Sequence, residues 1–168
     1  MRILAGLLTI GSYCLVSNAS ATPWGMAKNA DIGMADGEVS ICIPSAEKDE
    51  VAIESIWVAE NEPLDGKSHT MWDVELKRGS NPEILKPGEC AKYGSDLAAY
   101  QVNVSGQSLK VGVTYYFRLN RFMRNPSRTD VSFYDAVFCS VERDGKVFYL
   151  QYKYEDDGRV LKPQCGSK

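Results

Sequence analysis

A series of short β-rich segments, each ended by a turn signal, is the feature that most constrains the fold of this chain. Residues 71–77 show the pattern clearly, because Trp72, Val74 and Leu76 alternate with charged side chains. Such alternation predicts a strand with one buried and one solvent-facing side. The predicted strands are residues 38–43, 50–58, 71–77, 100–104, 115–122, 131–142, 146–154 and 160–161. About seven or eight short strands without helical periodicity are typical of an all-β sandwich.

The same alternation predicts which side chains point into the core. In residues 115–122 these are Tyr115, Phe117 and Leu119, and in residues 100–104 they are Tyr100, Val102 and Val104. In residues 131–142 the expected inward series is Val131, Phe133 and Val137. Asp135 falls within that series, and a charged residue at an inward position predicts a β-bulge.

Two turn motifs sharpen the expected fold. Asp144-Gly145 separates two strand segments and predicts a tight hairpin, because both central positions must accept a positive φ. The stretch Leu109-Lys110-Val111-Gly112-Val113-Thr114-Tyr115 resembles the tyrosine corner of immunoglobulin-like and fibronectin type III domains, where the tyrosine hydroxyl bonds back to nearby backbone. We therefore expect an immunoglobulin-like or fibronectin type III-like sandwich.

Residues 1–21 have the three parts of a cleavable secretory signal peptide. Arg2 supplies the positive charge, residues 3–16 are almost wholly apolar, and Ala19-Ser20-Ala21 offers small residues for cleavage before Thr22. The apolar segment is shorter than the roughly 20 residues that a transmembrane helix needs. We expect an exported chain with residues 22–35 as a loosely ordered arm and residues 36–168 as one β-sandwich domain.

Cys14 raises an alternative form of export. A lipoprotein signal also ends at a cysteine, which is then acylated and anchors the chain to a membrane, so Cys14 is a possible lipidation site. Tyr13 is bulky where the lipoprotein peptidase requires a small side chain, and this favours a soluble protein. Contact with a membrane is expected only through such a lipid.

The remaining cysteines are Cys42, Cys90, Cys139 and Cys165. An even number of widely spaced cysteines in an oxidising compartment usually forms disulfides, and four allow three pairings. We favour Cys42 with Cys90, and Cys139 with Cys165, because the second bond would tie a short C-terminal tail to a central strand. A zinc site would need close pairs such as C-x-x-C, which the sequence lacks.

Charge and composition weigh against several classes of function. The formal net charge is −3, so no basic surface for nucleic acid is expected. His69 is the single histidine, in a segment without a nucleophile motif, and the paired cysteines would leave no thiolate. Acidic clusters at residues 47–50 and 155–157 coincide with turns. We expect no enzyme and no cofactor, although carboxylates brought together by the fold keep a small hydrolase open.

A concentration of arginine in this acidic chain favours recognition of a protein. The candidate partner-binding residues are Arg118, Arg121, Phe122, Arg124, Arg128 and Tyr134. Arginine and aromatic side chains are the types that contribute most to binding energy at interfaces. A solvated strand end with scattered ion pairs remains the alternative.

Four segments together resemble the small periplasmic lipoproteins assigned to type VI secretion immunity. They are residues 36–43, the Leu-Lys-Pro-Gly-Glu-Cys sequence at 85–90, residues 109–116 and the Tyr-Asp-Ala-Val-Phe-Cys sequence at 134–139. The resemblance spans most of the chain after residue 21. It implies a cell-envelope protein that binds and neutralises a toxin from a neighbouring bacterium, although Cys14 lacks a good lipoprotein motif.

Two functions are therefore expected in order of preference. The first is a periplasmic immunity or inhibitor protein that binds a secreted toxin stoichiometrically. The second is an envelope structural, adhesive or carbohydrate-binding β-sandwich module, because this fold class also serves those roles.

Overall fold

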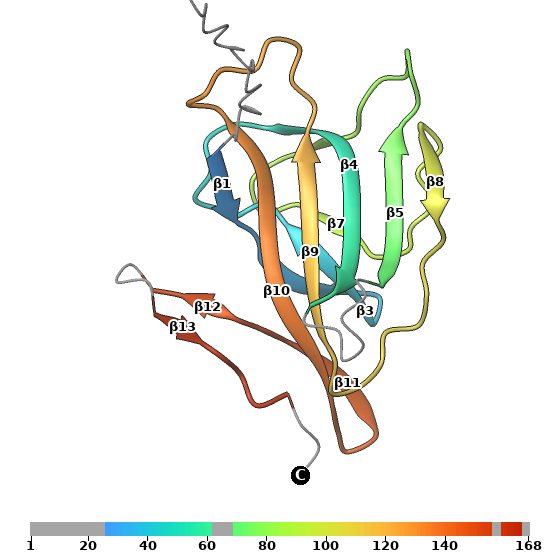
Figure 1. The fold of residues 1–168 in the computed structure, drawn as a ribbon, viewed down its shortest axis with the longest axis vertical. Coiled ribbons are helices and arrows are strands. Elements are labelled where there is room, and N and C mark those ends of the chain that lie inside the picture. Colours follow the sequence, from blue (N-terminus) through green and yellow to red (C-terminus); the bar gives the residue numbers. More distant parts are fainter. Residues whose placement is uncertain (1–25, 62–68, 156–158, 166–168) are drawn as a thin grey trace, which may run out of the picture.

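The computed structural model describes residues 26–61, 69–155 and 159–165, and every regular element within these ranges is a β-strand (Figure 1). The predicted signal peptide and Cys14 lie outside the described residues. Within the described ranges no helix is long and apolar enough to cross a membrane. The all-β class predicted from alternation is therefore confirmed.

Thirteen strands are described. They are β1 (Met26–Asn29), β2 (Asp31–Ala35), β3 (Glu38–Cys42), β4 (Val51–Glu60), β5 (Thr70–Leu76), β6 (Ile84–Leu85), β7 (Cys90–Lys92), β8 (Tyr100–Val104), β9 (Thr114–Arg121), β10 (Val131–Arg143), β11 (Lys146–Gln151), β12 (Lys153–Tyr154) and β13 (Val160–Leu161). Each predicted segment contains a strand, whereas β1, β2, β6 and β7 were not predicted.

The strands form a large sheet, a three-stranded sheet and a small hairpin. The large sheet has the order β1-β10-β9-β4-β5-β8, with β11 also pairing β10 and β6 also pairing β4. The three-stranded sheet has the order β2-β3-β7, and Figure 1 shows it behind the large sheet. The β12–β13 hairpin extends to one side of this sandwich-like body (Figure 1).

The core lies between the two sheets and follows the predicted alternation in β5 and β9. Trp72 and Val74 of β5 are buried, and so are Tyr115, Phe117 and Leu119 of β9. The ring of Trp72 meets those of Tyr93 and Phe117 edge-on, at centroid distances of 5.5 and 6.3 Å. Edge-to-face contacts of this kind add to the stabilisation that burial alone provides.

Both turn motifs adopt the expected geometry. Asp144 and Gly145 have positive φ angles of 52° and 71°, and they join β10 to β11 in a tight hairpin. Tyr115 accepts a hydrogen bond at 2.7 Å from the backbone N–H of Lys110. Gly112 between them has a φ of 81°, a conformation that side chains with a Cβ rarely adopt.

Both favoured cysteine pairings are confirmed, because Cys42 is bonded to Cys90 and Cys139 to Cys165. The first bond joins β3 to β7, and β2 passes closely over it, since a Cβ at Gly33 would lie 3.0 Å from the Cys42 Sγ. Two disulfides in one small domain are typical of chains that fold in an oxidising compartment.

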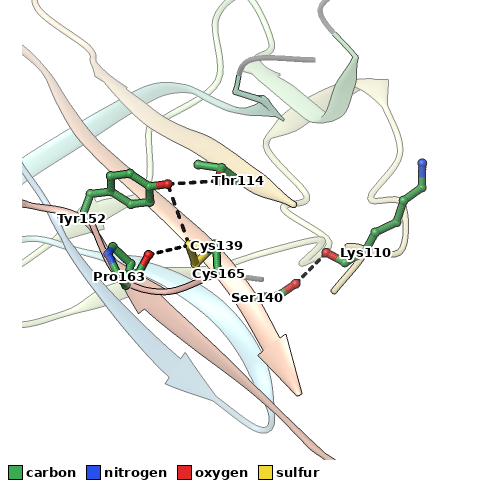
Figure 2. The surroundings of a disulfide bond; sticks show 7 residues. All are labelled: Lys110, Thr114, Cys139, Ser140, Tyr152, Pro163 and Cys165. Carbon is green, nitrogen blue, oxygen red and sulfur yellow. Dashed lines mark hydrogen bonds between the residues drawn. A yellow bond between two sulfur atoms is a disulfide. The ribbon is translucent and has the colours of Figure 1, made fainter. Parts of the chain in front are cut away.

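The second disulfide ties the C-terminal segment to β10, as Figure 2 shows. The Tyr152 hydroxyl lies 3.1 Å from the Thr114 Oγ1 and 3.8 Å from the Cys165 Sγ. The neighbouring Ser140 hydroxyl donates to the Lys110 carbonyl at 2.7 Å. The tail, β10 and the turn before β9 are thereby fastened at one place.

The prediction of a loosely ordered arm at residues 22–35 is wrong for its described part, where β1 and β2 lie. β1 pairs with β10 in parallel and β2 pairs with β3, so these strands are held by partners rather than by an apolar pattern of their own. The Gln151 side chain links them, because its amide donates to the Ala30 carbonyl at 2.6 Å and accepts from the Ile32 N–H at 2.7 Å.

The predicted orientation of β10 is also wrong. Tyr134, Ala136 and Phe138 are the residues buried in the core, so Asp135 points outward and pairs directly with Arg118 without a bulge. The alternation misled because apolar residues occupy both faces of this strand. Register shifts lie elsewhere: the pairing of β1 with β10 skips a residue between Val131 and Phe133, and the pairing of β4 with β9 shifts between Ile53 and Ser55.

Val102 was expected to point into the core and is instead 54% exposed. It belongs to β8, the edge strand of the large sheet, which pairs with β5 alone among the described strands. A side chain at such an edge has a neighbouring strand on one side only, so alternation overestimates its burial.

The buried tyrosines make the fold sensitive to alkaline pH. Burial raises the pKa of Tyr93 to about 12, from an ordinary value of about 10. Between these values the unfolded chain loses the Tyr93 proton while the folded chain keeps it, so we expect the free energy of unfolding to fall as the pH rises from 10 to 12. Urea denaturation at several pH values should show a shallower decline for Tyr93→Phe, and identical slopes would contradict this expectation.

Candidate functional site

The outward side of the large sheet carries a row of chemically distinctive side chains. Trp57 of β4, Arg118 of β9 and Asp135 of β10 are direct cross-strand partners, so they lie side by side across three central strands. Tyr116 lies two residues before Arg118 in β9, and its cross-strand partners are Val137 of β10 and Ala59 of β4. Tyr115, Phe117 and Leu119 of β9 are buried in the core. Successive side chains of a strand point to opposite sides, so Tyr116 and Arg118 face away from the core.

Arg118 is held in place by Asp135. Its Nε donates to the Asp135 Oδ1 at 2.8 Å and its Nη2 donates to the Asp135 Oδ2 at 2.9 Å, a bidentate ion pair. The side chains are 31% and 20% exposed, so solvent still reaches both. A partly exposed pair contributes at most about 1 kcal/mol to stability. Its main effect is to fix the orientation of the guanidinium.

Aromatic rings surround the guanidinium of Arg118. Its Cζ lies 3.8 Å from the ring centroid of Phe133 and 5.2 Å from that of Tyr116, both within cation–π range. The Tyr116 hydroxyl also accepts a hydrogen bond from the Arg118 Nη2. The Trp57 ring meets Tyr116 edge-on at 5.7 Å. We call Trp57, Tyr116, Arg118, Phe133 and Asp135 together the Arg118 face.

Two polar contacts brace the Arg118 face at its borders. The Trp57 indole N–H donates to the Thr70 Oγ1 at 3.3 Å, and the Asn120 amide donates to the Ser55 Oγ at 2.7 Å. These contacts restrict the side chains around the Arg118 face before any partner arrives. A rigid surface loses less conformational entropy on binding.

The charges on this surface are stable near neutral pH. Hydrogen bonding to Asp135 raises the pKa of the Arg118 guanidinium, so the group stays charged. Burial, followed by the hydrogen bond to Asp135, raises the pKa of the Tyr116 phenol, so that group stays neutral. The Arg118 face therefore presents one cation, one anion and three aromatic rings.

The predicted arginine segment does not form one surface. Arg121 lies on the opposite side of β9 from Arg118, paired with Ile53, and its Nη1 donates to the Val131 carbonyl at 3.1 Å. Arg124 and Arg128 are exposed in the loop between β9 and β10. Phe122 is half-buried just after β9.

Tyr134 is buried in the core, with 2% of its surface exposed, so its predicted role in partner binding is wrong. The expected orientation of β10 had placed this ring outside. Trp57, Tyr116, Phe133 and Asp135 were not proposed from the sequence as partner-binding residues. The one sequence signal was that Tyr116 and Arg118 alternate with the apolar residues of the same strand, which places both on its outward side.

The other residues considered for chemistry lie apart from the Arg118 face. His69 lines a cavity of about 180 Å³ together with Glu60 and Lys110. Glu47, from the first acidic turn, forms an ion pair with Lys28 at 2.7 Å. Within the described residues, no group of three histidine, cysteine or acidic side chains is arranged to hold a metal ion.

No protein family, curated protein or solved structure matches this chain.

Proposed function

We propose that this chain is an exported binding protein that captures a protein toxin on its Arg118 face and neutralises it by occlusion. The observation that carries the proposal is the preformed arrangement of Arg118 between Phe133 and Tyr116, held by both oxygens of Asp135. Arginine, tyrosine and tryptophan are the side chains that most often dominate the binding energy of interfaces.

The position of these residues suits a protein partner. They lie on three central strands of the sheet rather than in a deep cleft, and such a surface can meet another protein over many side chains. Occlusion needs a rigid complementary surface and no reacting group. Stoichiometric inhibition is consistent with that requirement.

The site of action that we propose is the periplasm. The signal-peptide pattern of residues 1–21 supports export, and the two disulfides suit an oxidising compartment. We favour a soluble protein that begins at Thr22 over one anchored through Cys14, because Tyr13 is unsuited to lipoprotein processing.

We also propose an immunoglobulin-like or fibronectin type III-like arrangement of the sandwich. The hydrogen bond between Tyr115 and the Lys110 backbone supports it, because tyrosine corners of those domains make a similar bond. The four sequence segments that resemble type VI secretion immunity proteins fit the same proposal.

An envelope module that binds carbohydrate is the second candidate. The rings of Trp57 and Tyr116 are in contact, and the amide of Asn120 lies farther along β9 on the same side; aromatic rings and amides can both bind sugars. The two rings are inclined by 64°, however, so they do not form one flat platform for a sugar chain. This inclination favours the protein partner.

We expect Arg118→Ala to weaken toxin binding by about thirtyfold, the effect of losing an interface residue of the strongest class. The partner to use is a secreted toxin, sought first among the products of the genes beside this one, and the dissociation constant of its complex with the mature chain is measured by calorimetry. Arg124→Ala is the matched control, because Arg124 is exposed in the loop between β9 and β10 and is not one of the residues of the Arg118 face. We expect that control to retain its affinity within about threefold.

A bacterial survival assay provides a second readout. Cells that export the native chain should survive periplasmic delivery of the toxin, cells with Arg118→Ala should survive less well, and cells with Arg124→Ala should match the native chain. The proposal would be refuted if that toxin did not bind, or if both arginine variants bound as tightly as the native protein.

A further inference from the structure

A small cavity adjoins the Arg118 face on the side of β1. Its volume is about 150 Å³, and its walls include residues 27–29, Tyr116, Asp135 and Tyr154 of β12. A cavity of roughly this size can hold a benzene molecule, so it has room for the end of one long side chain. Binding there would extend the contact made at the Arg118 face.

The carboxylate of Asp135 is the central polar group of this cavity. Each of its oxygens accepts one hydrogen bond from Arg118, and a carboxylate oxygen can accept a second. Arg118 itself is not one of the described residues that line the cavity. The Tyr116 phenol is a further hydrogen-bond partner of Asp135, so a second cation would use the acceptor capacity that Arg118 and Tyr116 leave open.

Two tyrosine rings complete the environment for a cation. Tyr116 and Tyr154 both line the cavity, and their aromatic faces can attract a positive charge. Burial, with a further contribution from Asp135, raises the pKa of Tyr154 as it does that of Tyr116, so both phenols are neutral near pH 7. Neither ring adds a negative charge of its own.

Lys28 is the cationic residue among the described residues that line the cavity, and its ammonium already has an acidic partner. The Lys28 ammonium donates to both carboxylate oxygens of Glu47, at 2.7 and 2.8 Å. That ion pair offsets the charge of Lys28. Asp135 is paired in its turn with Arg118, but it is the acidic side chain among the described residues that line the cavity.

From this geometry we propose that the cavity receives one cationic side chain, lysine or arginine, from the protein partner. The inference rests on the proposed function and specifies what the partner must present beside the Arg118 face. The partner's cation would bind the free acceptor positions of Asp135 between the rings of Tyr116 and Tyr154.

The test uses the isolated mature chain, labelled with ¹⁵N, and three capped amino acids. Nα-acetyl-lysine methylamide and Nα-acetyl-arginine methylamide are the cationic probes, and the norleucine analogue is the neutral control of similar length. In NMR titrations we expect saturable shifts of the backbone amides of Asn29, Asp135 and Tyr154 with either cationic probe. We expect the norleucine analogue to bind about fivefold more weakly.

Two substitutions separate the cavity from the rest of the surface. Asp135→Asn removes the charge, and Tyr154→Ala removes one ring without touching the Arg118–Asp135 pair, so each should weaken the cationic probes by about fivefold. Val160→Ala is the control, because Val160 pairs with Tyr154 across the hairpin but does not line the cavity. Equal binding of all three probes, or binding unchanged by both substitutions, would overturn the inference.

This experiment can fail separately from the proposed function. If the probes do not bind but toxin binding still depends on Arg118, the cavity inference is wrong and the proposed function stands. If the probes bind and the toxin does not, the cavity is a cation site and the proposed function is wrong.

Discussion

Replacing Cys42 and Cys90 together by alanine is expected to lower the free energy of unfolding by roughly 4 kcal/mol. The two cysteines are 48 residues apart in sequence, and their bond removes the entropy of closing that loop from the unfolded chain. The bond also joins β3 to β7 at the edge of the three-stranded sheet. The loss can be measured by urea denaturation followed through tryptophan fluorescence, because Trp72 is buried in the core.

The second disulfide provides the comparison for that experiment. Cys139 and Cys165 are 26 residues apart, so replacing both by alanine should cost somewhat less, roughly 3.5 kcal/mol. A loss below about 1 kcal/mol for the Cys42/Cys90 variant would show that loop entropy does not govern this effect.

Phe117→Ala is expected to lower the free energy of unfolding by about 3–5 kcal/mol, the usual cost of truncating a buried aromatic side chain. Phe117 is fully buried, and its ring lies 6.3 Å from Trp72 and 6.4 Å from Tyr93 between centroids. Removing it leaves a cavity beside the rings of Trp72 and Tyr93. Urea denaturation of the two proteins under the same conditions measures the difference.

Phe148→Ala is the matched control for the core substitution. Phe148 lies in β11 and is 39% exposed, so its truncation should cost less than about 1 kcal/mol. Equal losses for the two phenylalanine variants would contradict the description of the core.

The sequence predicted the elements whose pattern is local. Alternation around Trp72 and Phe117 identified two core strands, and the positive φ demanded by Asp144-Gly145 identified the hairpin. β1 was missed because β10, a strand distant in the sequence, holds it, and pairing of that kind leaves no periodic signal. β2 pairs with its sequence neighbour β3 through Asp36-Gly37, a turn signal of the same type as Asp144-Gly145 that the prediction did not use. β10 was misoriented because both of its faces are apolar.

The candidate site depends on cross-strand register, which a single sequence does not contain. Arg118 was proposed from its residue type, but Trp57 comes from a strand far away in the chain, and only the register with the next strand shows that Asp135 is its partner. Asp135 was interpreted as a disruption of the strand, whereas it is the anchor of Arg118. Tyr134 was selected for its aromatic ring, and only its burial shows that the ring belongs to the core.

The parallel pairing of β1 with β10 has a consequence for the order of folding. Met26 is paired with Val131, so the first strand cannot find its place until most of the chain is present. Contacts between such distant segments slow folding, because the loop between them must close before the contacts form. The docking of β1 is therefore expected among the last steps of folding, after β10 has formed a partner for it.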